Sequence, residues 1–181
     1  MSNINIAYVK TRFGELIIGS YQDQLCLCDW RYRKARERVD KRIKQTLDAH
    51  YVLQHDEVIV QTIHELEEYS AGQRQVFSIP LLLVGSDFQQ QVWRKLIEIP
   101  YAQSVSYLAL SKLLGNEKAI RAVANANGAN AISIIVPCHR VIGSDGKLVG
   151  YAGGVDTKKR LLAMELSNSG QGAMTETLDL F

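Results

Sequence analysis

Residues 118–141 read KAIRAVANANGANAISIIVPCHRV. The first part has the apolar spacing of a helix, which we expect over Glu117–Asn127 and ended by Gly128. The apolar, β-branched run Ile132–Val136 follows and is typical of a buried strand. That run leads straight into Pro137-Cys138-His139-Arg140. The sequence therefore predicts a reactive cysteine exposed at a turn, where it can do something other than pack.

A second short apolar helix, Ser106–Leu114, is expected before this stretch and is separated from it by Gly115-Asn116. Two helices joined by such a turn indicate a helix-turn-helix, a motif that often binds DNA. In its second helix, Ala122 and Ala126 would put small side chains on the surface, so that this face could approach another backbone closely. Alanine is also the best helix former, so spacing alone leaves that explanation open. The expected packing stripe consists of Ala119, Ile120 and Val123.

Near the N-terminus, three short runs with β-branched or alternating residues are separated by turn-like segments. They predict antiparallel strands over Ile4–Val9, Glu15–Ser20 and Leu25–Trp30. Apolar residues at helical spacing then predict amphipathic helices through Val39–Leu47 and Ile59–Leu66. We expect residues 1–84 to form an α/β N-terminal domain, a short antiparallel sheet with helices.

A mainly helical second domain is expected over residues 85–168. It begins at Ser86-Asp87-Phe88-Gln89, a capping-box pattern that starts a helix ended by Ile99-Pro100. Its last helix is expected from Asp156 to about Leu166. Residues 169–181 are mostly polar, and we expect a flexible tail there.

Composition and charge narrow the class of protein. The chain has 181 residues and a formal net charge of +2, and no apolar run approaches the ~20 residues that cross a membrane. It starts without the pattern of a secretory signal, and its three cysteines cannot all pair, so we expect a cytoplasmic location and no membrane partner. Residues 31–44 hold eight basic and two acidic side chains, which also fits the solvated side of a helix. Residues 101–160 hold eight basic and three acidic, surround Cys138 and permit phosphate contact.

The neighbours of Cys138 favour its reactive thiolate form. A free cysteine has a pKa near ~8.5, and an adjacent imidazole or cation lowers it, so His139 and Arg140 are candidate activators. Glu165 falls on the apolar face of the last expected helix, where a buried carboxylate needs a partner. We infer a Cys–His–Glu relay in which Glu165 orients His139 and raises its basicity, and His139 deprotonates Cys138 directly or through water. The alternative is an inert, buried cysteine beside a surface histidine.

Five ordered motifs resemble those of the O6-alkylguanine-DNA alkyltransferases and cover roughly residues 86–166. They are Phe88–Trp93 (FQQQVW), Val105-Ser106-Tyr107, Lys118–Ala124, Asn130 eight residues before Pro137–Val141 (PCHRV), and Gly150-Tyr151. The resemblance implies a winged-helix-like DNA-binding domain, and the first half of the chain is compatible with that family's N-terminal domain. It further implies a monomer that acts on double-stranded DNA. Such a protein moves an alkyl group from O6 of guanine, and also O4 of thymine, onto its own cysteine, once and without a cofactor.

The resemblance also assigns roles to matching positions. Cys138 is then the acceptor, His139 the base that acts through a water, and Glu165 the carboxylate that orients this base. Tyr107 matches the tyrosine that helps rotate the damaged nucleotide and protonates guanine N3. Arg121 matches the finger that fills the vacated base stack.

Other matching positions would receive the DNA and the rotated base. Asn130 corresponds to a hinge between the recognition helix and the active-site strand. The carbonyls of Val141 and Cys138 would accept hydrogen bonds from the guanine amino group. In the family the recognition helix enters the minor groove, which would explain the small Ala122 and Ala126.

A loop over residues 150–154 would close over the base. Tyr151 lies in it, Lys158 is expected to support it, and Ala152 stands where some members carry serine, so a hydroxyl is missing. The zinc site of some relatives has no visible ligand set here. Cys26 and Cys28 alternate along an expected strand without a second ligand cluster, so we expect core packing and no metal.

Two other functions fit parts of the pattern. A cysteine hydrolase that uses Cys138, His139 and Glu165 would turn over repeatedly. A helix-turn-helix regulator, or a protein that binds lesions without repairing them, would need no acceptor cysteine, so Cys138 favours catalysis.

The chain ends in TLDLF, which looks like the short motif by which bacterial repair proteins dock on the replication sliding clamp. Leu178–Phe181 is therefore expected to bind that clamp.

Overall fold

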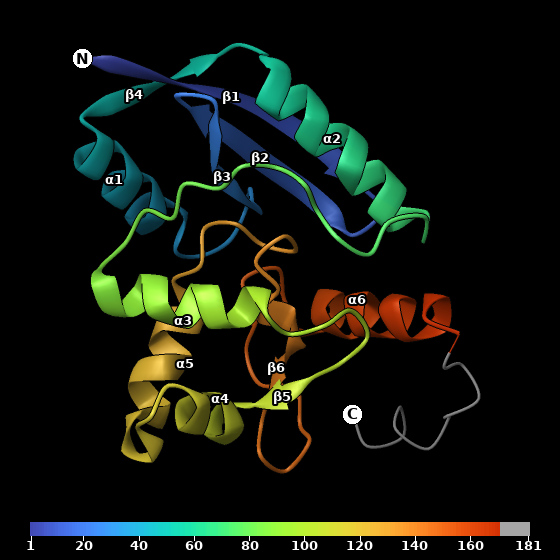
Figure 1. Ribbon diagram of the computed structural model, residues 1–181. Coiled ribbons are helices and arrows are strands. Elements are labelled where there is room, and N and C mark those ends of the chain that lie inside the picture. Colours follow the sequence, from blue (N-terminus) through green and yellow to red (C-terminus); the bar gives the residue numbers. More distant parts are fainter. Residues whose placement is uncertain (171–181) are drawn as a thin grey trace. The chain divides into compact units, whose positions relative to one another are not determined.

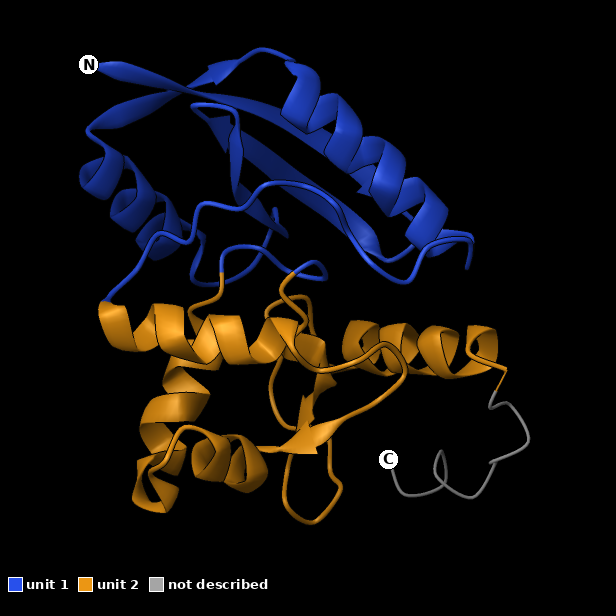
Figure 2. Cartoon of the chain, viewed as in Figure 1, with its two compact units in different colours: residues 1–86, 131–135 blue, residues 87–130, 136–181 orange. Residues whose placement is uncertain are grey.

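The computed structural model describes residues 1–170 (Figure 1). The chain forms two compact units, which Figure 2 shows in separate colours. Unit 1 consists of residues 1–86 together with 131–135, and unit 2 contains residues 87–130 and the chain from residue 136. The expected clamp motif, Leu178–Phe181, lies outside the described residues.

Unit 1 is built on a four-stranded sheet in the order β3-β2-β1-β4. The strands are β1 Ser2–Thr11, β2 Gly14–Tyr21, β3 Gln24–Trp30 and β4 Ala49–Leu53. The three predicted strands are confirmed as antiparallel neighbours, whereas β4 pairs in parallel with β1 and makes the sheet mixed. Strand β4 was not predicted, because this short edge strand (AHYVL) does not alternate regularly between buried and exposed positions.

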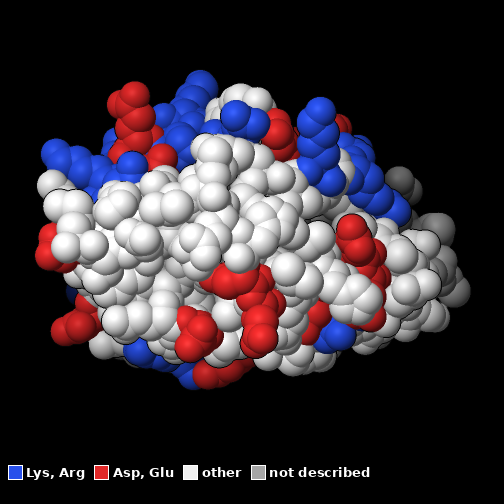
Figure 3. Space-filling view, turned by 90° about the horizontal axis from the view of Figure 1, so that it is seen from above, with Lys and Arg blue, Asp and Glu red and all other residues white. Residues whose placement is uncertain are grey.

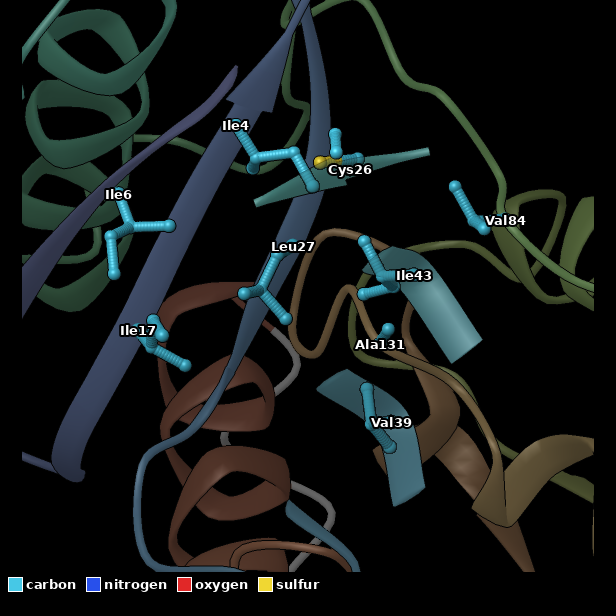
Figure 4. Packing of buried hydrophobic residues seen from close by; sticks show 10 residues of the cluster. Ile4, Ile6, Ile17, Cys26, Leu27, Val39, Ile43, Val84 and Ala131 are labelled. Atoms are coloured by element: carbon cyan, nitrogen blue, oxygen red, sulfur yellow. The ribbon is translucent and has the colours of Figure 1, made fainter. Parts of the chain in front are cut away.

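Two helices contribute to the core of unit 1. Helix α1 spans Arg36–Leu47 and helix α2 spans Glu57–Ser70, as the apolar spacing predicted. The Asp56 carboxylate accepts a hydrogen bond from the Ile59 N–H at 2.9 Å and so caps α2. Figure 4 shows the side chains of one core cluster of this unit. The cluster consists of Ile4, Ile6, Ile17, Cys26, Leu27, Val39, Ile43, Ala49, Val84 and Ala131.

Segment 131–135 lies against β3 but is not the strand that was predicted over Ile132–Val136. Ile132 forms a single parallel bridge with Cys28, and the Ser133 N–H donates to the Cys28 carbonyl at 2.6 Å. The backbone then turns through Ile134, whose φ of 71° is rare for a β-branched residue. A run of apolar residues indicates that a segment is buried, but it does not distinguish a buried strand from a buried turn.

Unit 2 is mainly helical. Its helices are α3 Asp87–Ile97, α4 Tyr107–Leu113, α5 Ile120–Gly128 and α6 Val155–Asn168. Two 3₁₀ turns, η1 Glu117–Ala119 and η2 Cys138–Arg140, and two short strands, β5 Val105–Ser106 and β6 Val141–Ile142, complete it. Helices α4 and α5 form the predicted helix-turn-helix, and Ser106 caps α4 by accepting a hydrogen bond from the Ala109 N–H at 3.0 Å. The strands pair in parallel.

Several basic side chains of residues 31–44 form ion pairs with acidic side chains of unit 1. Arg33 and Arg36 contact the fully buried Asp29 at 3.0 Å and 2.9 Å, and Arg31 contacts Glu15 at 2.8 Å. Arg36 also contacts Asp40 at 3.0 Å, so that three carboxylates neutralise these three cations locally. On the face of the molecule drawn in Figure 3, Lys and Arg lie mainly toward the margins, and the middle holds uncharged side chains together with several Asp and Glu side chains.

Residues 1–170 contain neither a membrane-spanning helix nor a cluster of metal ligands. None of the helices within residues 1–170 is long and apolar enough to cross a bilayer. Over the same residues, no group of three or more His, Cys, Asp or Glu side chains is arranged to hold a metal ion. Cys26 and Cys28 are buried in unit 1, and burial raises the pKa of Cys26 to about 12. Both cysteines therefore act as core residues.

Candidate active site

Cys138 opens the 3₁₀ turn η2 directly after Pro137. The turn is held by backbone hydrogen bonds from the Cys138 N–H to the Val136 carbonyl at 2.8 Å and from the Arg140 N–H to the Pro137 carbonyl at 3.0 Å. Only 4% of Cys138 is exposed, so the predicted exposure of this cysteine at the turn is wrong. Its sulfur lies inside unit 2, where charged neighbours act on it with little screening by water.

His139 and Glu165 form a buried pair. Helix α6 carries Glu165 on its inner face, and the Glu165 Oε1 lies 2.7 Å from His139 Nε2. Both side chains have no exposed surface. The expectation that this acid is buried and paired with the histidine is confirmed, and the alternative of a surface histidine is wrong.

Glu165 has further partners that sequence analysis missed. Arg140 donates three hydrogen bonds to its carboxylate, at 2.9 Å, 3.0 Å and 3.3 Å, and a fourth to the Ile99 carbonyl at 2.7 Å. The Ala102 N–H also donates to Glu165 Oε2 at 3.2 Å. The signal in the sequence was Arg140 itself, next to His139, because a second cation beside the same buried acid completes its neutralisation.

Charge and burial set the protonation states of this cluster. Burial alone would raise the pKa of Glu165, but His139 and Arg140 outweigh it and hold this pKa well below its usual range. Burial lowers the pKa of His139; Glu165 opposes this, and the charges of Arg140 and Lys158 add to the lowering. Glu165 thus raises the pKa of His139 in the predicted direction, but burial outweighs this effect and the net pKa of His139 is lowered.

A neutral His139 has one nitrogen to donate and one to accept. Its Nε2 faces Glu165, which fixes the proton there, so Nδ1 carries the free lone pair. Among residues 1–170, Nδ1 has no hydrogen-bond partner. This nitrogen is the one that remains to accept a proton.

Lys158 is also buried inside unit 2. It has no exposed surface, and its Nζ donates to the carbonyls of Val149 and Gly150 at 3.4 Å and 3.3 Å, in agreement with the expected support of the loop. Burial lowers the pKa of Lys158 to about 8, although the negative charge of a Cys138 thiolate acts to raise it. A cation held near the sulfur favours the thiolate form in return.

Tyr107 stands at the first position of α4 and is half-buried. Its hydroxyl accepts a hydrogen bond from Asn127 Nδ2 of α5 at 3.3 Å. Burial and the charge of Cys138 raise the pKa of Tyr107, while the Asn127 hydrogen bond lowers it. The predicted site residues Tyr107 and Cys138 thus influence each other electrostatically. Asn127 was not among the predicted site residues.

Three other predicted residues lie near this cluster. Tyr151 presents its ring at 69° to that of His139, with 6.5 Å between the ring centroids. Asn130 is buried, and its amide donates to the carbonyl of Val136, two residues before Cys138, at 2.9 Å. Val141 is buried and pairs with Val105 in the two-stranded sheet, and its N–H donates to the Cys138 carbonyl. Ala152 is half-buried in the loop after Tyr151.

The residues expected to face DNA separate into two groups. Arg121 and Ala122 are exposed on α5. Ala126 is only 3% exposed and its carbonyl accepts a hydrogen bond from Trp93 Nε1 at 2.8 Å, so its predicted place on the surface is wrong. The buried face of α5 runs through Val123, Ala126 and Asn127 at i, i+3 and i+4, and Ile120, expected in the packing stripe, is 39% exposed.

Comparison with known proteins agrees with this geometry. Residues 87–167 match the family described as 6-O-methylguanine DNA methyltransferase, DNA binding domain. The chain is 40% identical over 159 residues to the constitutive methylated-DNA–protein-cysteine methyltransferase of Bacillus subtilis. The aligned region covers 86% of this chain and 92% of that protein. It is 47% identical over 113 residues to the methylated-DNA–protein-cysteine methyltransferase of Methanosarcina acetivorans, covering 62% of this chain and 72% of that protein.

Solved structures show the same fold. The crystal structure of Mycobacterium tuberculosis OGT in complex with DNA matches with a TM-score of 0.77 and 33% sequence identity. The match covers 92% of this chain and 94% of that chain, so both halves of the predicted fold class are confirmed. From the Bacillus subtilis relative and this structural match, the chain belongs to the family of methylated-DNA–protein-cysteine methyltransferases.

Proposed function

We propose that this chain repairs DNA by moving the alkyl group of an O6-alkylguanine base onto Sγ of Cys138, once per molecule. The observation that carries the proposal is the fully buried contact of 2.7 Å between His139, in the turn that begins with Cys138, and Glu165 of α6. The same unit carries a helix-turn-helix with Arg121 exposed on its second helix. The reactive cysteine and the helix-turn-helix proposed to bind DNA thus lie in the same unit.

Activation of the thiol follows from the protonation states. Neutral His139 keeps its Nε2 proton toward Glu165 and accepts the Cys138 proton at Nδ1, through one water molecule. Glu165 stabilises the imidazolium that forms. The buried Lys158 ammonium stabilises the thiolate, which is the nucleophile.

The transfer step is a displacement at the alkyl carbon. The Cys138 sulfur forms the new S–C bond while the C–O6 bond breaks, and the electron pair of that bond stays on the guanine. The proton of the Tyr107 hydroxyl passes to guanine N3, so that the base leaves uncharged. The thioether that remains has no good leaving group, which makes the reaction irreversible and stoichiometric.

The O6 atom of a paired guanine lies inside the duplex, so the nucleotide must first rotate out of the stack. That rotation costs a few kcal/mol and is easiest where the lesion weakens pairing. Arg121 is exposed on α5 and long enough to occupy the vacated position, and Ala122 beside it leaves room for close approach to the backbone. Tyr151, whose ring centroid lies 6.5 Å from that of His139, and Ala152 belong to the loop that in this proposal closes over the rotated base, and Asn130 secures the segment before Cys138. O4-alkylthymine presents the same kind of carbon and is the second expected substrate.

A time course separates this function from its rivals. Excess duplex that contains O6-methylguanine should lose one methyl group per protein molecule, and the reaction should then stop. A cysteine hydrolase would continue past one equivalent, because water would regenerate the sulfur. A regulator that only binds lesions would leave the methyl group on the DNA.

The finer partner assignments extend the same proposal. The protein acts as a monomer in the cytoplasm, and Leu178–Phe181 docks it on the replication sliding clamp. The support for docking is the sequence TLDLF alone. Deletion of Leu178–Phe181 should abolish clamp capture in a pull-down and leave methyl transfer to Cys138 unchanged; equal capture without these residues would refute the docking role.

A further inference from the structure

The contact between Asn127 and Tyr107 joins the two helices of the helix-turn-helix at the reacting end of the site. Asn127 lies near the end of α5 and is 7% exposed, and its Nδ2 donates to the Tyr107 hydroxyl oxygen at 3.3 Å. The other amide atom, Oδ1, is buried and has no hydrogen-bond partner within residues 1–170. A buried acceptor left unpaired costs free energy, so this asparagine is poorly explained by packing alone.

The direction of this hydrogen bond has a chemical consequence. Because the amide donates, the Tyr107 oxygen uses a lone pair and its own O–H proton stays available for transfer. The opposite amide orientation would let Oδ1 accept that proton and would make Tyr107 a poorer acid. The orientation of the Asn127 amide thus decides whether the Tyr107 O–H proton is available for donation to the guanine base.

The charges around Tyr107 oppose ionisation of its phenol. Burial is the largest cause that raises its pKa, and the negative charge of Cys138 in η2 raises it further. Lys158 of α6 faces Cys138 and offsets part of that charge. Asn127 of α5 is the group whose hydrogen bond acts in the other direction.

We propose that Asn127 is a positioning residue for the acid step: its amide N–H holds the Tyr107 oxygen and stabilises the phenolate that forms as the Tyr107 proton moves to guanine N3. The inference rests on the proposed function. In this step the O–H bond of Tyr107 breaks, the N3–H bond forms, and the electron pair of the broken C–O6 bond is accommodated in the neutral guanine. The phenolate and the His139 imidazolium then return to their resting states by proton exchange with water.

The first test needs no substrate. The protein is labelled with ¹³Cζ-tyrosine, the Tyr107 signal is assigned with Tyr107→Phe, and its pH titration is followed by NMR in the wild type, Asn127→Ala, Asn127→Asp and the control Asn125→Ala. Asn125 is exposed on the same helix. The midpoint should rise in Asn127→Ala and rise further in Asn127→Asp, because a carboxylate repels the phenolate. An unchanged midpoint in both Asn127 variants would overturn the proposal.

The second test separates acid catalysis from packing. Methyl transfer is timed on duplexes that carry either O6-methylguanine or O6-methyl-3-deazaguanine, which has a C–H group in place of N3. Asn127→Ala should slow transfer from O6-methylguanine about tenfold, the worth of one hydrogen bond to an ionised oxygen. It should leave transfer from the 3-deaza base within about twofold of wild type, and add nothing to the loss in Tyr107→Phe.

Equal losses on both bases would show a purely structural role and refute the inference. Asn127→Asp preserves the size of the side chain, so it keeps the test valid if Asn127→Ala folds poorly. If the wild-type chain transferred no methyl group at all, the proposed function would fail, whereas the NMR titration would still decide whether Asn127 stabilises the Tyr107 phenolate.

Discussion

Replacement of Lys158 by methionine tests whether a buried cation is kept for chemistry at the expense of stability. The Lys158 side chain has no exposed surface, and burial lowers its pKa from 10.5 to about 8. The folded protein therefore holds this proton less tightly than the unfolded chain does. Below about pH 8 the charged lysine opposes folding, and the penalty fades as the pH rises from 8 toward 10.5.

The size of the effect follows from that difference. A shift from 10.5 to about 8 corresponds to about 3 kcal/mol, at about 1.4 kcal/mol for each pKa unit. Methionine has a similar volume and no charge, so Lys158→Met should raise the free energy of unfolding at pH 7 by up to about 3 kcal/mol. The carbonyls of Val149 and Gly150 that lose their donor lie in exposed residues, where water replaces it.

Urea unfolding of the wild type and Lys158→Met at pH 7 and pH 10 measures the difference directly. The gain should be present at pH 7 and small at pH 10, and methyl transfer at pH 7 should be slower in the variant because the thiolate has lost its cation. A variant that is less stable than wild type at pH 7, or a gain that does not depend on pH, would refute this reasoning.

Three further substitutions probe other parts of the site. Glu165→Gln should destabilise the protein by about 3–5 kcal/mol, because Arg140 is left buried without its counter-charge. The difference in thermal unfolding between variant and wild type should shrink below about pH 4.5, since the lowered pKa of Glu165 stabilises the fold only while the carboxylate is ionised. A loss of stability that stays constant with pH would contradict the pairing. Cys138→Ala should bind methylated duplex with unchanged affinity and transfer nothing, whereas residual transfer would place the acceptor elsewhere. Arg121→Ala should slow repair of duplex at least tenfold more than its reaction with free O6-benzylguanine, and equal losses would exclude the finger role.

The sequence was most informative where one local pattern had one physical outcome. Alternation of apolar residues identified β1–β3, and helical spacing identified α1, α2 and the helix-turn-helix. Glu165 was found by a different route, because an acid on an apolar helical face must be paired when it is buried. His139 was predicted as the partner of Glu165 because an imidazole next to the reactive cysteine can pair with a buried carboxylate. The 2.7 Å contact between Glu165 and His139 confirms this pairing.

The features that sequence analysis missed depend on tertiary contacts. The run Ile132–Val136 has strand composition but turns through Ile134, because its backbone pairs with Cys28 over only one bridge. Ala126 has the size expected of a residue that faces DNA, and only the packing of α5 shows that it faces inward. The hydrogen bonds of Arg140 to Glu165 bridge distant parts of the chain, so no local pattern records them.

The most direct measurement of the central claim is the mass of the protein after incubation with a duplex that contains O6-methylguanine. We expect a gain of one methyl group in every active molecule, located on the peptide that contains Cys138, and an equal loss of methyl groups from the DNA. Loss of the methyl group from the DNA without a gain in protein mass, or a gain on any other peptide, would contradict it.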